Sequence, residues 1–194
     1  MAKATNDTRE RIVTASAELF RRQGYNATGV KQIVADASAP FGSLYHFFPG
    51  GKEQLGAETI RWSGARYGEL IDLIFDPAPD VVTAVENFFA GAAETLRETG
   101  YEDACPIATV ALEVASTNET LRLVTHDVFE LWLASLTSRL ATAGLDEIRA
   151  RELAILAVTA LEGAFMLSRA AKNTEAMHVT GRFVVREIER SLRR

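Results

Sequence analysis

The stretch 38–55 reads Ser-Ala-Pro-Phe-Gly-Ser-Leu-Tyr-His-Phe-Phe-Pro-Gly-Gly-Lys-Glu-Gln-Leu and decides the fold of its region. Pro40 and Pro49 bracket a short segment that directly follows another segment with apolar residues at helical spacing. A proline in the first turn of a helix is tolerated because its missing N–H has no partner there. The pattern therefore predicts two short helices, at about 28–38 and 40–47, joined as a helix-turn-helix.

The second of these helices is predicted to have an inner and an outer side. Leu44 and Phe48 fall on the inner side, whereas the outer side carries small and polar residues, namely Gly42, Ser43, Tyr45 and His46. A short helix with such a surface can lie in the major groove of DNA while the preceding helix crosses the backbone. The sequence therefore predicts a DNA-binding segment.

These residues also resemble a known family. The pattern consists of Ile12, Ala15, Ala17, Leu19, Phe20, Gly24, Tyr25, Thr28, Ile33, Ala37, Gly42, Leu44, Tyr45, Phe48, Lys52 and Leu55. It is similar to the DNA-binding domain of TetR-type transcriptional repressors. The stretch 42–55, together with the Cys-Pro segment at 105–113, more narrowly resembles the subgroup of lincomycin-resistance and flavonoid-responsive repressors.

The resemblance implies an all-α fold of nine helices, three and then six. It implies a helix-turn-helix DNA-binding domain at residues 1–50 and an effector-binding and dimerisation domain at 51–194. The implied protein is a homodimer that represses transcription and releases a palindromic operator when a small hydrophobic effector binds. Planar polyphenols and hydrophobic antibiotics are the effectors that the subgroup implies.

Charge is distributed unevenly along the chain. The net charge of -5 alone argues against nucleic-acid binding. Residues 1–52, however, hold seven Lys or Arg against four Asp or Glu, while the remainder holds 14 against 22. A basic end on an acidic body fits a protein that meets DNA at one end. Alternatively, these charges only keep exposed helix faces solvated and have no part in binding DNA.

Several other classes lack support in the sequence. The first ten residues contain no apolar segment, and no run reaches the roughly 20 apolar residues of a membrane helix. A single cysteine agrees with a reducing compartment, so we expect a cytoplasmic protein without a membrane partner. Gly51-Lys52 lacks the other residues of a phosphate-binding loop, and the three histidines lack the spacing of metal ligands. We therefore expect no enzyme, no metal and no cofactor.

Apolar periodicity and capping residues predict the helix bounds. The first helix is expected to begin at a capping box, Asp7-x-x-Glu10, and to stop at Gly24. Beyond the helix-turn-helix, the expected helices are at about 52–75, 80–100, 103–115, 118–143, 146–171 and from 173–174 to the end.

The predicted DNA contacts are Thr28, Lys31, Phe41, Gly42, Ser43, Tyr45, His46 and Lys52. Lys52 begins a helix, where backbone N–H groups already favour a phosphate. Thr28 is expected to be an N-cap and a phosphate contact, although the cap alone would explain it. Gly42 permits close approach to the bases or serves packing only, and Ser43 binds DNA or caps its helix. Phe41 stands where the wider family has a polar residue.

The predicted effector site combines aromatic walls with a few polar groups. Its residues are Trp62, Tyr67, Phe88, Phe89, Cys105, Thr109, Glu113, Phe129, Trp132 and Phe165. Core packing is the alternative role for most apolar residues at this spacing. Cys105 is either a small buried thiol, the favoured reading, or a redox sensor at a helix start.

Small residues form a face on the helix 146–171 and continue at Gly181. The face consists of Ala157, Ala160, Gly163, Ala164 and Ala170. It serves either a two-fold dimer, the reading that we favour, or close packing inside one subunit. The alternative to a repressor is a helical small-molecule-binding or scaffolding protein whose helix-turn-helix is vestigial.

Overall fold

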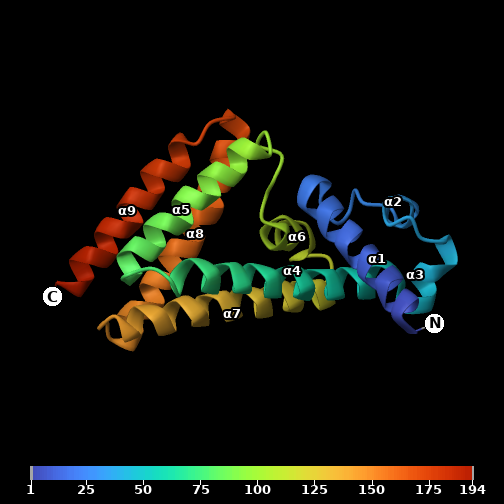
Figure 1. Ribbon diagram of the computed structural model, residues 1–194, viewed down its shortest axis with the longest axis horizontal. Helices are drawn as coiled ribbons and strands as arrows, with labels where there is room; N and C mark the ends of the chain where they lie inside the picture. The colour runs from blue at the N-terminus through green and yellow to red at the C-terminus, as the bar shows by residue number, and fades with distance from the viewer. Residues whose placement is uncertain (1, 194) are drawn as a thin grey trace. The chain divides into compact units, whose positions relative to one another are not determined.

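The computed structural model describes residues 2–193 and the side chains of residues 7–193, and all regular secondary structure in this part of the chain is helical (Figure 1). Its helices are α1 (Ala2–Gln23), α2 (Val30–Asp36), α3 (Phe41–Phe47), α4 (Gly51–Phe75), α5 (Val81–Glu98), α6 (Pro106–Val114), α7 (Glu119–Thr142), α8 (Glu147–Ala171) and α9 (Glu175–Leu192). The predicted all-α fold, three helices followed by six, is confirmed.

The start of α1 differs from the prediction. The helix begins at Ala2, so the expected capping box at Asp7 is wrong. Asp7 lies inside the helix and forms an ion pair with Arg11, one turn further on. The end of α1 agrees with the sequence, because Gly24 takes the left-handed conformation, with φ +84°, that favours glycine after a helix.

Capping explains the starts of three later helices. Asp80 accepts a hydrogen bond from the backbone N–H of Thr83 at 2.8 Å, and Asp146 accepts one from Arg149 at 3.0 Å. Helix α6 begins at Pro106, three residues later than expected, with Cys105 at its N-cap. Pro106 supplies no N–H and is therefore suited to the first helical position.

The chain forms two compact units, and neither is a continuous segment. One unit contains the chain through Ala65 together with Cys105–Val128, and the other contains Arg66–Ala104 and the chain from Phe129 onward. Helices α4 and α7 each contribute to both units. The predicted domain boundary at residues 50 and 51 stays a prediction.

In the first unit, α1, α2 and α3 enclose a small core (Figure 1). Ile12, Phe20, Ile33, Leu44 and Phe48 are fully buried in it. Burial of a large apolar side chain contributes about 1.5–3 kcal/mol. These residues therefore hold α3 in a fixed orientation against its neighbours.

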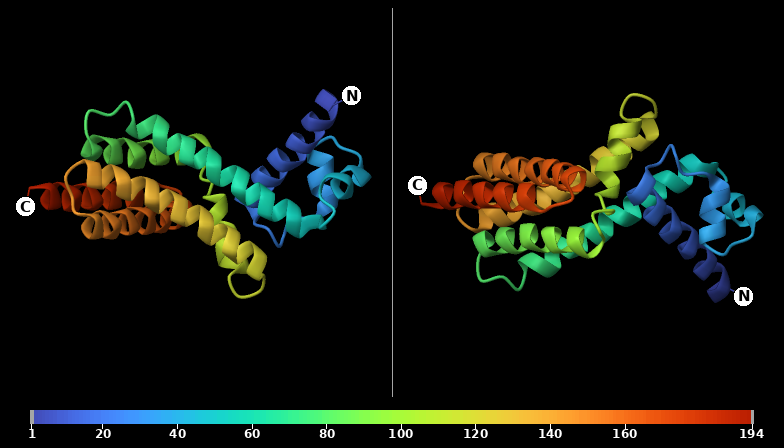
Figure 2. Two further views of the ribbon diagram at one scale, coloured as in Figure 1. Left: turned by 90° about the horizontal axis from the view of Figure 1, so that it is seen from below. Right: turned by 90° about the horizontal axis from the view of Figure 1, so that it is seen from above.

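In the second unit, α9 packs along α5 and α8, as both views of Figure 2 show. Gly181 of α9 is buried, and a Cβ there would lie 2.9 Å from the Cβ of Phe89 on α5. Gly181 thus serves close packing inside the subunit, and its predicted place in a dimer face is wrong. Gly163 of α8 differs, because a Cβ there would meet no atom within 4 Å.

One long helix, α8, is apolar on a side that the chain leaves exposed. By length and composition alone it could cross a membrane, contrary to the expectation that no stretch would, and 28% of its apolar window is buried inside the protein. Ile148, Met166 and Leu167 are among its exposed side chains. An exposed apolar patch rimmed by polar residues also marks a surface that meets another protein.

Candidate DNA-binding surface and effector region

The turn between α2 and α3 fixes the orientation of α3. Ser38 has a φ of +49°, in the left-handed region that favours glycine. Its backbone N–H donates to the carbonyl of Ala35 at 3.0 Å, and that of Ala39 donates to Val34 at 2.9 Å. Pro40 is the N-cap of α3 with φ -59°. The helix therefore starts one residue after the predicted position.

The outer side of α3 carries the predicted residues. Phe41, Gly42, Tyr45 and His46 are exposed, and Ser43 is half-buried. The rings of Phe41 and Tyr45 meet edge to face with 5.9 Å between centroids. A Cβ at Gly42 would meet no atom within 4 Å, so packing inside the chain does not require this glycine. The side of α3 opposite Leu44 is thus open for a partner.

Thr28 differs from the prediction. The N-cap of α2 is Gly29, and Thr28 is fully buried. Its hydroxyl donates to the carbonyl of Gly24 at 2.6 Å and accepts from Gln23 at 3.2 Å. The expected N-cap role is wrong, because the side chain stabilises the α1–α2 turn from inside. A phosphate contact by Thr28 remains a prediction, and its burial argues against it. Lys31, on α2, is exposed.

Lys52 lies in the first turn of α4, as predicted, and is half-buried. Its ammonium group lies 4.2 Å from the centroid of the Tyr25 ring, a cation–π contact. Burial lowers the pKa of Lys52 below its ordinary value, and the carboxylate of Glu113 opposes this shift. Burial, and then the charge of Glu53, raise the pKa of Tyr25. The predicted phosphate contact of Lys52 is untested.

Two polar contacts join α6 and the turn after it to the α1–α2 turn and to α4. The backbone N–H of Asn26 donates to Glu113 Oε2 at 2.8 Å, and Asn118 Nδ2 donates to Glu53 Oε2 at 2.7 Å. Glu113 Oε1 lies so close to Gly24 that a Cβ there would approach it to 1.8 Å. Glu113, expected in an effector site, therefore directs its carboxylate to the α1–α2 turn.

Two family models match separate parts of the chain. Residues 12–59 match the model of bacterial regulatory proteins of the tetR family, and residues 81–183 match the C-terminal domain of LmrA/YxaF-like transcriptional regulators. The chain is also 38% identical to the uncharacterized HTH-type transcriptional regulator YxaF of Bacillus subtilis, over 86% of this chain and 87% of that one. This chain belongs to the TetR family of transcriptional regulators.

Other relatives agree with the assignment. The HTH-type transcriptional regulator LmrA of Bacillus subtilis is 33% identical over 90% of this TetR-family chain and 93% of its own. Among solved structures, a TetR transcriptional regulator from Chloroflexus aurantiacus has a TM-score of 0.81 and 25% identity, with 97% of each chain covered. One from Legionella pneumophila also has a TM-score of 0.81, at 23% identity, covering 92% of this chain and 95% of that one.

Three predicted effector residues of this TetR-family chain lie together in the second unit. The ring centroids of Tyr67 and Trp132 are 5.9 Å apart, and those of Phe129 and Trp132 are 5.6 Å apart. Aromatic pairs at such distances contribute about 0.5–1.5 kcal/mol beyond their buried area. The cluster joins α4 to α7, and its Trp132 is buried.

The remaining aromatic residues of the predicted site have other surroundings. Phe88 pairs with Phe75 at 6.2 Å between centroids, and Phe89 is buried against α9, where packing explains it. Phe165 is half-buried on α8. Trp62 belongs to the first unit, where it lines a cavity of about 390 Å³ between α1 and α4 with Val13 and four charged side chains.

Cys105 and Thr109 form part of the cap of α6. The buried Cys105 sulfur accepts a hydrogen bond from the N–H of Ala108 at 3.4 Å, and the Thr109 hydroxyl donates to the Cys105 carbonyl at 2.9 Å. The burial agrees with the favoured reading of Cys105. The contacts of Asn26 with Glu113 and of Glu53 with Asn118 were missed, because residues 87 and 65 positions apart show no local signal.

Proposed function

We propose that this protein is a cytoplasmic transcriptional repressor that binds a palindromic operator as a homodimer and releases it when a small hydrophobic effector binds. The observation that carries the proposal is the open side of α3, which presents Gly42, Tyr45 and His46 while Leu44 and Phe48 are buried behind it. Each subunit would insert α3 into one major groove, so the two-fold symmetry of the dimer would match that of the operator.

The effector proposed is apolar and aromatic. The cluster of Tyr67, Phe129 and Trp132 supports it, because stacked and edge contacts favour planar ring systems. The family consists of transcriptional regulators, and no residue described above has the geometry of a catalytic group. We therefore propose a binding protein and no enzyme.

In this proposal, helix α6 transmits the effect of effector binding to the DNA-binding helices. Glu113 accepts from the α1–α2 turn, so a shift of α6 would change the support of the DNA-binding helices. An effector that prefers the shifted arrangement would lower the population that fits DNA. A coupling free energy of about 1–3 kcal/mol is typical of such effects.

The homodimer would form on the exposed apolar side of α8. Ile148, Met166 and Leu167 lie on that side, and Gly163 leaves room above it for another helix. Burying these side chains between two copies would supply the apolar core that stable interfaces have.

The test measures binding to a DNA duplex from the region upstream of the protein's own gene, at several salt concentrations. Gly42→Glu places a carboxylate on the open side of α3 without a clash, so operator affinity should fall at least about tenfold. The matched control is Gly91→Glu on α5, where a Cβ also meets no atom within 4 Å. Its affinity should equal that of the parent.

Two results would contradict the proposal. Failure of the folded parent to bind any such duplex at low salt would favour the scaffolding alternative. Equal losses in the two glutamate variants would mean that charge anywhere on the protein, rather than the surface of α3, determines binding.

A further inference from the structure

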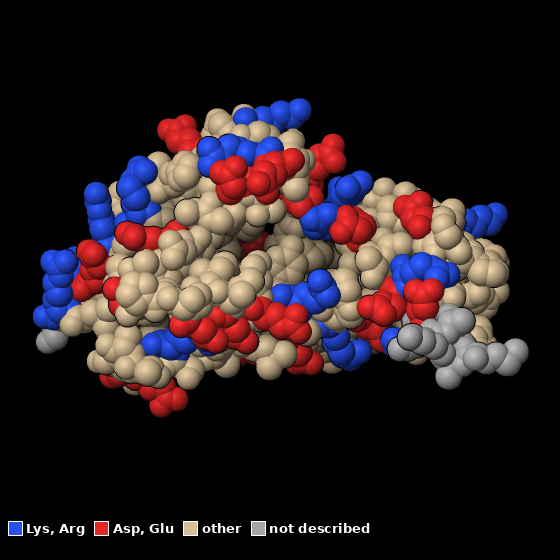
Figure 3. All heavy atoms as spheres, in the orientation of Figure 1, with Lys and Arg blue, Asp and Glu red and all other residues tan. Residues whose placement is uncertain are grey.

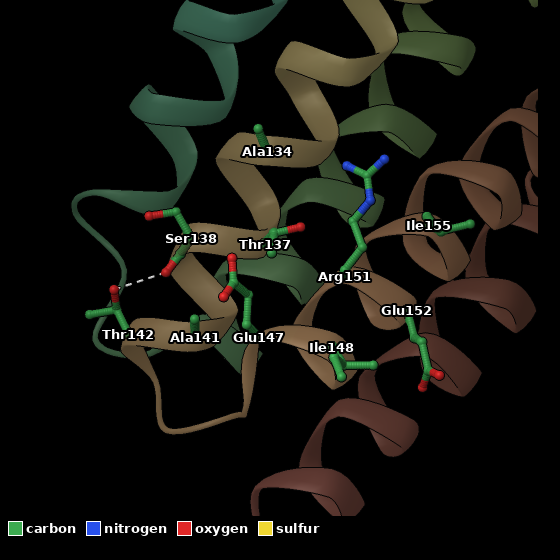
Figure 4. Close-up of a pocket in the computed structure, with 10 residues that line it drawn as sticks. All are labelled: Ala134, Thr137, Ser138, Ala141, Thr142, Glu147, Ile148, Arg151, Glu152 and Ile155. Carbon is green, nitrogen blue, oxygen red and sulfur yellow. Dashed lines mark hydrogen bonds between the residues drawn. The ribbon is translucent and has the colours of Figure 1, made fainter.

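The hollows of the protein surface differ in their surroundings. The groove between α7 and α8, with a volume of about 960 Å³, has the exposed Ile148 and Ile155 in its wall and belongs to the apolar side of α8 (Figure 4). The cavity of about 390 Å³ between α1 and α4 instead lies in the first unit, and charged side chains form most of its wall. On the right of Figure 3, acidic and basic side chains lie next to one another over α1 and the start of α4. The charges of this cavity can therefore join the two helices.

The two arginines of the α1–α4 cavity differ in their contacts. Arg9 forms an ion pair with Glu58, which links α1 to α4. Arg61 and Glu10 also line the cavity, but both are exposed and neither forms an ion pair within the described chain. The guanidinium of Arg9 also lies 5.3 Å from the centroid of the Phe48 ring, a cation–π contact. Arg9 therefore contacts both α4 and the C-cap residue of α3.

The carboxylate of Glu58 continues this contact along α4 to the turn after α3. Gln54 Nε2 donates to Glu58 Oε1 at 3.0 Å, and Gln54 Oε1 accepts from the backbone N–H of Gly50 at 2.8 Å. We call the side chains of Arg9, Glu58 and Gln54 the Arg9 network. The network begins on α1, crosses α4 and ends at the backbone of the α3–α4 turn.

The turn that the Arg9 network reaches determines where the last residues of α3 lie. The N–H of Phe48 donates to the carbonyl of Leu44 at 2.7 Å, and the N–H of Gly51 donates to the carbonyl of Phe48 at 2.8 Å. A Cβ at Gly51 would lie 3.6 Å from Cε1 of Tyr45, so the exposed Tyr45 ring lies beside the turn. His46, the next residue, is exposed as well. A displacement of the turn therefore moves Tyr45 and His46.

We propose that Arg9, Glu58 and Gln54 are positioning residues that hold Tyr45 and His46 in the orientation for reading the operator. The inference rests on the DNA binding of the proposed function and assigns a role to residues outside the exposed side of α3. Base contacts require fixed side-chain geometry, whereas phosphate contacts supply affinity for any sequence. Loss of the Arg9 network should therefore reduce the preference for the operator over an unrelated duplex.

Arg9→Gln removes both contacts of Arg9 and is the first test. The measured quantity is the ratio of two affinities, one for the duplex from the upstream region and one for a scrambled duplex of the same length. An exposed ion pair and a cation–π contact together correspond to about a three- to thirtyfold change in an equilibrium constant. We expect the ratio to fall within this range. Partial unfolding would lower both affinities equally and leave the ratio unchanged.

The same cavity supplies matched controls. Arg61→Gln removes the same charge from the same cavity but breaks no ion pair within the described chain, so its ratio should equal that of the parent. Glu10→Gln is the corresponding control for Glu58→Gln, which should lower the ratio as Arg9→Gln does. Gln54→Ala changes no charge and introduces a better helix former, so the lower ratio expected for it has neither charge nor helix propensity as its cause.

An exchange of charges distinguishes positioning from a phosphate contact by Arg9. The double variant Arg9→Glu with Glu58→Arg keeps the net charge and a pair of opposite charges between α1 and α4. It should recover a large part of the preference that Arg9→Glu alone loses. A phosphate contact by Arg9 predicts no recovery, together with a salt slope that is lower by about 1 for both duplexes.

Amide hydrogen exchange tests the Arg9 network without DNA. Exchange at the Gly50 N–H should become faster in Gln54→Ala and in Arg9→Gln, whereas Arg61→Gln should leave it unchanged. Circular dichroism checks that each variant is folded, and Gln54→Ala and the charge-exchange variant carry the test where Arg9→Gln is not.

A parental ratio in both Arg9→Gln and Gln54→Ala, or a charge exchange that recovers nothing, would overturn the inference while the parent still prefers the operator. A folded parent that binds no duplex would contradict the proposed repressor function and this inference together. The two failures are therefore distinguishable, because the first appears only in the variants and the second in the parent.

Discussion

Replacing Gly24 by alanine should weaken the connection between α6 and the DNA-binding helices. Gly24 has φ +84°, and the left-handed conformation costs a residue with a Cβ about 1–2 kcal/mol. The new Cβ would also lie 1.8 Å from Glu113 Oε1, so this carboxylate must move. The side chain can swing away, but the hydrogen bond from Asn26 to Glu113 is then lost, at a cost of about 1 kcal/mol.

The sum predicts a loss of about 2–3 kcal/mol in the free energy of unfolding. For a chain of 194 residues this lowers the melting temperature by about 5–10 °C. Thermal unfolding and urea titration of Gly24→Ala, Glu113→Ala and the double variant measure the effect. Glu113→Ala should cost about 1 kcal/mol in the parent and close to nothing in the Gly24→Ala background, because the hydrogen bond is already absent there.

Additive costs would refute this reasoning. If Glu113→Ala destabilises the parent and the Gly24→Ala variant equally, Glu113 does not depend on the space that glycine leaves at position 24. A Gly24→Ala variant as stable as the parent would in addition show that position 24 is not left-handed.

Three further predictions concern separate parts of the chain. Ser38→Gly should stabilise the protein by about 1 kcal/mol in urea titrations, because glycine relieves the left-handed strain at φ +49°; a loss of stability would contradict that conformation. Lys52→Ala should reduce the slope of log K for operator binding against log[salt] by about 1, and an unchanged slope would show that Lys52 serves only its contact with Tyr25. Trp132→Ala should reduce release of the operator by planar aromatic compounds while binding by the free protein survives; release by metal ions or oxidation alone would contradict the proposed effector class.

Much of the fold could be predicted from the sequence because its signals are local. Asp80 and Asp146 each determine a helix start through a hydrogen bond within one turn, whereas α6 begins at Pro106, three residues after the expected start. The side of α3 that faces the core follows from the spacing of Leu44 and Phe48 alone. Where local signals compete, the prediction failed, as at Asp7, whose capping pattern lies inside a longer helix.

The candidate functional residues could be predicted from the sequence only where they lie together on one helix. Exposed Tyr45 and His46 follow from the periodicity of α3. The position of Glu113 depends on how α6 packs against a turn 87 residues away, which no spacing rule describes. Similarly, the small-residue pattern could not separate Gly163 from Gly181, because the open and the packed glycine differ only in the neighbour that faces them.

The first unit is built from two separate segments of the chain, and this limits how its DNA-binding part can be exchanged with that of another regulator. The segment Cys105–Val128 belongs to the same unit as α1–α3, and α4 and α7 continue past the unit without a break. A chimaera that takes only the first 50 residues from another regulator brings in a foreign partner for Glu113, the acceptor of the Asn26 N–H, although Glu53, the partner of Asn118, stays native. Exchange of operator specificity between relatives by a single crossover is therefore disfavoured. Substitutions on the exposed side of α3 leave these contacts intact and offer the simpler path to a new operator.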